Sequence, residues 1–82
     1  MIVYVVICLW SNEDNCRDSY THIFYTYNKA KAYFDQRVEE TKRADYFDSS
    51  YRIHEDKYGN YWLAEQNHTS YIEFSIEERE VE

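Results

Sequence analysis

Residues 2–10 read IVYVVICLW, an unbroken apolar run that is rich in Val and Ile and has the length of a β-strand. Successive side chains of a strand point to opposite faces of the sheet, and in this run both sets are apolar. Strands of this kind occur where a sheet is covered on both sides. We therefore expect the segment to lie centrally in a sheet.

From residue 26 to about residue 43 the apolar side chains recur at the spacing of an α-helix. Either Thr26 or Asn28 can cap this helix, because each has a side-chain oxygen that can accept a hydrogen bond from the free amides of the first turn. The pattern predicts one helix that packs on the sheet through a single stripe. The stripe comprises Ala30, Tyr33, Phe34, Arg37, Val38 and Thr41.

The other segments predict strands at residues 21–25, 51–55, 61–66 and 70–76, with a surface loop at 11–20 and a turn at 67–69. Gly59, the one glycine of the chain, falls in a turn where a positive φ is needed. The element order β-β-α-β-β-β predicts an α+β fold: a single, mostly antiparallel sheet with one helix packed on one face. The 82 residues correspond to a single domain, residues 1–82, whose C-terminus at 78–82 we expect to fray.

The charge of the chain limits its partners. Sixteen acidic residues stand against nine basic ones, which gives a formal net charge of −7. Direct binding to nucleic acid or to an anionic membrane is disfavoured, because each phosphate contact needs a cation. The natural complement is a larger protein with a basic surface.

No catalytic or metal-binding pattern accompanies these features. Cys8 and Cys16 match no zinc or redox spacing, and the three histidines, His22, His54 and His68, lie on different predicted elements. The N-terminal apolar run has neither a basic region before it nor a small-residue cleavage site after it. We expect a cytoplasmic protein that is not an enzyme and that holds neither a cofactor nor a metal.

Two segments resemble a known group of proteins. Tyr4-Val5-Val6 in the first strand, and Phe-Tyr-Thr-Tyr-Asn-Lys-Ala at 24–30 leading into Tyr33-Phe34, resemble small uncharacterised bacterial and phage β-β-α-β proteins. Those proteins have a Tyr-Val-Val strand followed by a Phe…Lys-Ala helix entry. This chain differs from them by its additional hairpin at 57–69. The resemblance implies a phage or mobile-element context, in which the cytoplasm is that of the host cell, and it implies no particular activity.

Aromatic and acidic residues supply the candidate binding site. The chain has 10 Tyr, more than so small a core can hold, and exposed Tyr is common at binding hot spots. We expect aromatic residues on the sheet face opposite the helix, and we expect the C-terminal carboxylates to follow one side of the last strand at about the spacing of nucleic-acid phosphates, roughly 7 Å. The predicted partner-binding residues are Tyr51, Tyr61, Trp62, Tyr71, Glu73, Glu77, Glu78 and Glu80.

These features favour a small acidic protein-interaction module, such as a phage-type inhibitor that occupies the basic nucleic-acid-binding surface of a larger protein. The alternative is a homodimeric module that binds a small ligand or nucleotide by stacking Tyr and Trp rings on it. An uncovered sheet face in so short a chain also invites a second copy, so a homodimer is expected.

Overall fold

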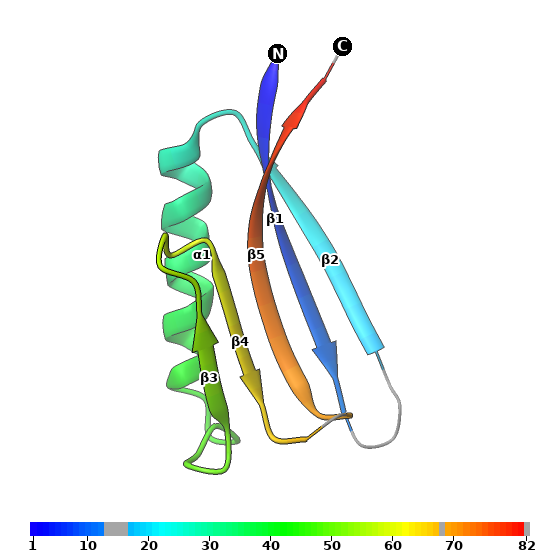
Figure 1. Ribbon diagram of the computed structural model, residues 1–82, viewed down its shortest axis with the longest axis vertical. Coiled ribbons are helices and arrows are strands. Elements are labelled where there is room, and N and C mark those ends of the chain that lie inside the picture. The colour runs from blue at the N-terminus through cyan, green and yellow to red at the C-terminus, as the bar shows by residue number, and fades with distance from the viewer. Residues whose placement is uncertain (13–16, 68, 82) are drawn as a thin grey trace.

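The structure, a computed structural model, describes residues 1–12, 17–67 and 69–81. Five strands form one sheet in the order β2-β1-β5-β4-β3, in which every neighbouring pair is antiparallel, and α1 lies across one face of it (Figure 1). This confirms the predicted α+β fold. The elements are β1 (Ile2–Ser11), β2 (Arg17–Phe24), α1 (Tyr27–Lys42), β3 (Arg52–Glu55), β4 (Tyr61–Glu65) and β5 (Tyr71–Glu80).

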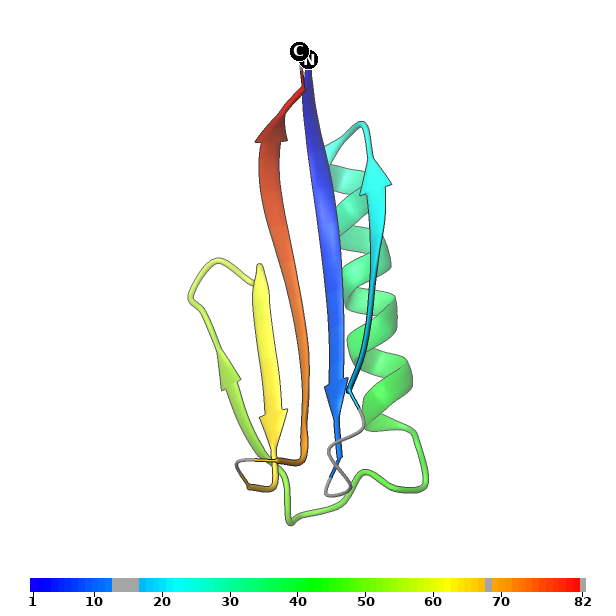
Figure 2. The same cartoon turned by 90° about the vertical axis from the view of Figure 1, so that its right-hand side faces the viewer.

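β1 is an interior strand, as its two apolar faces predict. It pairs with β2 on one side and along its whole length with β5 on the other, from Ile2 opposite Glu80 to Ser11 opposite Tyr71. The pairing continues past the strand ends, since the Val81 amide donates to the Met1 carbonyl at 2.7 Å. Both chain ends therefore lie together at one end of the sheet (Figure 2).

α1 packs on the sheet through the predicted stripe. Thr26 is the cap, because its hydroxyl accepts a hydrogen bond from the Lys29 amide at 3.3 Å. Arg37 and Tyr33 are half-buried at the edge of the stripe, whose remaining members are buried. The core that the helix closes consists of Val6, Cys8, Ala30, Phe34, Val38, Trp62, Ala64, Ile72 and Phe74.

Two strands are longer than the sequence predicted. β2 begins at Arg17 where a loop was expected, and β5 continues to Glu80 where an end near residue 76 was expected. In both places the neighbouring part of β1 offers unpaired backbone groups, and hydrogen bonding to them outweighs the polar composition of the added residues. The segment at 78–82 that was expected to fray is therefore part of β5 up to Glu80, and residue 82 lies outside the described residues. Residues 13–16 of the expected loop also lie outside the described residues.

The turn between β3 and β4 has the geometry predicted for it. Gly59 has a φ of 74°, a backbone angle that residues other than glycine rarely adopt. The Asp56 carboxylate accepts a hydrogen bond from the Asn60 amide at 2.8 Å, and the Lys31 ammonium reaches across from α1 to the Gly59 carbonyl. The helix and the β3–β4 hairpin are therefore joined at this point.

Candidate functional site

The candidate site is the sheet face that points away from α1, which we call the open face. Figure 2 shows this face toward the viewer, with the helix behind the sheet. In the described part of the chain no second layer covers it. Residues that are opposite one another in neighbouring strands point to the same face of the sheet. Val5 of β1 lies opposite Ile23 of β2 and Glu77 of β5, and Glu73 of β5 lies opposite Leu9 of β1 and Leu63 of β4, so β1, β2, β4 and β5 all contribute side chains to the open face. The open face includes Val3, Val5, Ile7, Leu9, Ile23, Tyr61, Leu63, Tyr71, Glu73 and Glu77.

An apolar column runs along the middle of the open face. It consists of Val3, Val5, Ile7 and Leu9 of β1, and Ile23 of β2 adjoins it with 63% of its surface exposed. The sequence predicted apolar residues on both faces of this strand, which is confirmed. Among the described residues the single helix covers only the other face of the strand. Val3 and Val5 are nevertheless buried within this face.

Tyr61 and Tyr71 lie on the open face, as predicted. The Tyr61 hydroxyl donates a hydrogen bond to the Glu73 carboxylate at 3.0 Å. Partial burial, reinforced by this carboxylate, raises the pKa of Tyr61 to about 12, so the phenol stays neutral. Beside this pair is a shallow hollow of about 250 Å³, lined by Leu63, Glu65, Asn67, Tyr71 and Glu73.

The four predicted carboxylates divide between the two faces of β5. Glu73 and Glu77 are on the open face, whereas Glu78 and Glu80 lie opposite Tyr4 and Ile2 on the other face. Four residues along a strand span about 13 Å. Glu73 and Glu77 therefore share one side and Glu78 and Glu80 the other, so the predicted single row with the spacing of phosphates is wrong.

Two of the predicted aromatic residues are on the helix side instead. Trp62 lies opposite Phe74 in the register, stacks on its ring at 5.6 Å and is only 2% exposed. Tyr51 precedes β3 and stacks on Phe47 at 4.9 Å, against the core. Both placements on the open face were wrong. For Trp62 the reason is strand register, which the sequence does not show, whereas Tyr51 lies before β3 and packs on Phe47. The Trp62 ring is too buried to stack on a ligand from the open face.

The apolar column was not among the predicted site residues. The signal for it was present in the sequence, since residues 2–10 are apolar on both faces while only one amphipathic helix is available to cover a sheet. A face that is apolar and has no helix to cover it is a candidate interface.

The cysteine and histidine described next pack against other side chains of the fold. Cys8 is a buried free thiol, and burial raises its pKa although the nearby Arg37 opposes the shift. His22 lies between the rings of Tyr20 and Tyr33. Over the described residues there is no group of three or more side chains that could hold a metal, and no helix is long and apolar enough to cross a membrane. Cys16 and His68 lie outside the described residues.

Comparison of the chain with protein families, with curated proteins and with solved structures gave no significant match. The resemblance of residues 3–6 and 24–34 to small phage proteins therefore stays a prediction.

Proposed function

We propose that this chain is a protein-interaction module that binds a larger protein through its open face. The observation that carries the proposal is the apolar column on a sheet face that α1 does not cover. A sheet buries its apolar side chains against another layer, and a partner can supply that layer. Tyr61 and Tyr71 at the side of the column are residue types that supply large contact areas at low entropic cost.

The charge of the chain indicates the chemistry of the partner. The net charge is −7, and the open face carries Glu73 and Glu77 next to the apolar column, with Arg79 of the same face paired to Glu77. A matching surface has an apolar centre and a basic rim. An inhibitor that occupies a basic nucleic-acid-binding surface is one form of this proposal. In it the accessible part of the apolar column, which comprises Ile7, Leu9 and Ile23, supplies most of the affinity, and the carboxylates speed the encounter.

The two faces of β5 provide a matched test. The chain is immobilised, bound proteins are recovered from an extract of the organism in which it acts, and binding of the purified partner is then measured. Changing Glu73 and Glu77 together to Gln should slow association with that partner several-fold at low salt, because electrostatic steering acts mainly on the association rate. Changing Glu78 and Glu80 to Gln removes the same charge from the other face and should have a smaller effect.

A second pair of variants tests the apolar contact. Ile23→Ser should speed dissociation of the complex, whereas Tyr58→Ser, at an equally exposed position in the β3–β4 turn, should leave it unchanged. Equal effects within both pairs would rule out the open face as the binding surface. Recovery of only the chain itself would assign the face to a second copy.

A further inference from the structure

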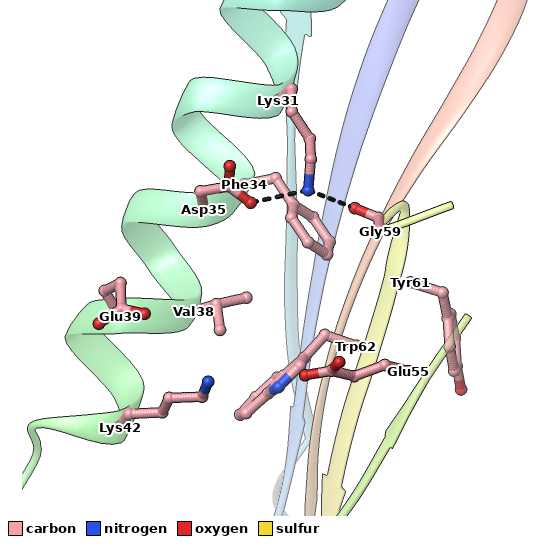
Figure 3. A pocket seen from close by; sticks show the side chains of 10 residues that line it. All are labelled: Lys31, Phe34, Asp35, Val38, Glu39, Lys42, Glu55, Gly59, Tyr61 and Trp62. Atoms are coloured by element: carbon pink, nitrogen blue, oxygen red, sulfur yellow. Dashed lines mark hydrogen bonds and ion pairs between the residues drawn. The ribbon is translucent and has the colours of Figure 1, made fainter. Parts of the chain in front are cut away.

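A pocket of about 380 Å³ lies on the opposite side of the molecule from the open face, between α1 and the β3–β4 hairpin (Figure 3). Its inner wall is apolar and consists of Phe34, Val38 and Trp62. Its rim is charged on both sides, with α1 contributing lysine and carboxylate groups and β3 contributing Glu55. The volume is within the range of small-molecule sites, which extends upward from about 300 Å³.

Trp62 presents an unpaired hydrogen-bond donor at this pocket. The residue is 2% exposed, and within the described residues its indole Nε1 has no hydrogen-bond partner. Buried donors are nearly always paired in folded proteins, because an unpaired one has lost its hydrogen bonds to water. An acceptor atom of a ligand that reached this nitrogen, whose own surface is almost fully covered, would restore the lost hydrogen bond.

Two charged groups that line the same pocket are uncommitted. Lys31 is occupied, since its ammonium contacts the Asp35 carboxylate at 2.7 Å and the Gly59 carbonyl. For Lys42 and Glu55, in contrast, the described part of the chain supplies no side-chain partner. In the view of Figure 3 the indole nitrogen of Trp62 is seen between the Lys42 ammonium and the Glu55 carboxylate.

The charges of the lining limit the ligand. Two ammonium groups and three carboxylates line the pocket, the third carboxylate being that of Glu39. A simple anion would add to this negative excess in a chain whose net charge is already −7. A simple amine would leave the Trp62 donor unpaired. A ligand that carries both an acceptor anion and a cation satisfies all three groups.

We propose that this pocket binds a small zwitterion with an apolar body, of the class of apolar α-amino acids. The ligand carboxylate accepts from the Trp62 indole and pairs with Lys42, its ammonium group faces Glu55, and its side chain packs on Phe34 and Val38. The proposal does not depend on the proposed function, because the ligand contacts named here are on the helix side of the sheet. Tyr61, which also lines the pocket, belongs to the open face and makes none of them.

The test uses the two indole N–H resonances of the protein in ¹H–¹⁵N spectra, with Trp10 as the internal control. L-phenylalanine should shift the Trp62 resonance with a Kd on the order of 1 mM, as expected for about a dozen non-hydrogen atoms at ordinary ligand efficiency. 3-Phenylpropionate, which lacks the ammonium, and phenethylamine, which lacks the carboxylate, should each bind about 10-fold more weakly.

Variants assign the contacts. Lys42→Gln should weaken L-phenylalanine binding about 10-fold, while Lys29→Gln, at an exposed position near the start of the same helix, should leave it unchanged. Trp62→Phe keeps the ring and removes the donor, and it should weaken binding to a similar extent. Because Lys42 is exposed, its variant tests the proposal even if the Trp62 variant unfolds.

Three results would overturn the proposal: no movement of the Trp62 resonance at about ten times the expected Kd, equal binding of the three compounds, or equal binding by the two lysine variants. The ligand-free Glu55→Gln variant supplies a further check. The proposal would also be overturned if this substitution alone shifted the Trp62 resonance as much as L-phenylalanine does. That result would show that Glu55, its neighbour in the strand register, already accepts from the indole in solution.

Discussion

Arg37 shows how a charged residue takes part in the apolar stripe of α1. Its guanidinium group lies over the rings of Trp10, Tyr20 and Phe74 at 5.5, 5.8 and 5.9 Å. It also donates to the Tyr20 hydroxyl and to the Glu40 carboxylate. Aromatic faces attract cations, so the methylene stem can be buried while the charge keeps partners.

Phe34 and Asp35 are adjacent in α1 and differ in burial. Phe34 is 4% exposed in the core, whereas the Asp35 side chain is 58% exposed and pairs with Lys31. Phe34→Ala should lower the free energy of unfolding by about 3–5 kcal/mol, a large part of the stability of a small domain. Asp35→Ala should change it by less than about 1 kcal/mol. Urea denaturation of both variants measures this, and equal mild losses would mean that another face of α1 packs on the sheet.

Tyr61 should titrate abnormally. Its pKa is raised to about 12, first by burial and then by the hydrogen bond to Glu73. Because the folded-state pKa exceeds the unfolded value of about 10, the neutral phenol stabilises the fold fully below pH 10, and this contribution is lost as the pH rises through 12. Glu73→Gln should lower the pKa of Tyr61, as followed by the ¹³Cζ shift of a labelled ring.

Glu77→Gln is the control for this titration, since Glu77 shares the open face and pairs with Arg79 instead. If the two variants change the Tyr61 titration equally, the shift depends on the general negative field and not on the hydrogen bond.

At the scale of elements, β1 and β5 form the long central pair of the sheet. Ten residues of each strand are in register, and the pairing reaches the acidic end of the chain. The carboxylates at that end are thereby fixed on alternating faces. The same alternation gives β1 one column for the core and another for the open face.

The start of α1 offers an element-level prediction. The Thr26 hydroxyl caps the helix, whereas the Asn28 side chain is exposed within the first turn. Thr26→Ala should therefore lower the free energy of unfolding by about 1 kcal/mol. Asn28→Ala should leave it unchanged or raise it slightly, because Ala has the higher helix propensity. Thermal melting monitored by circular dichroism distinguishes the two, and a larger loss for Asn28→Ala would assign the cap to that residue.

At the scale of the whole molecule, the one helix and five strands of the described residues form two layers, and the two proposed occupants of the open face are a partner protein and a second copy. The salt dependence of binding distinguishes these two occupants. Binding of a basic partner should weaken as salt rises, because screening reduces the attraction between opposite charges. Self-association of a chain with a net charge of −7 should strengthen, because screening reduces repulsion between the copies.

Light scattering at micromolar concentration, repeated from low to high salt, measures the self-association. A mass that stays at 10.1 kDa throughout would contradict the predicted homodimer and leave the open face to a different protein. A dimer that dissociates as salt rises would contradict the charge argument.

Local patterns were sufficient for the type and order of the elements, but not for the start of β2 or the end of β5. Apolar periodicity determined the face of α1 that packs, the two-sided character of β1 and, with the turn residues, the α+β class. Gly59 was placed correctly because the backbone of the turn requires a positive φ. These features depend on residues that are close together in the sequence, so a single sequence is enough to predict them.

The candidate site needed the tertiary structure. A shift of one residue in strand register moves every side chain to the other face, and register depends on pairing between segments far apart in the chain. Trp62 therefore lies in the core and Tyr61 on the open face, although they are adjacent. Glu77 and Glu78 are separated in the same way, and backbone pairing with β1 is what extends β5 to hold them.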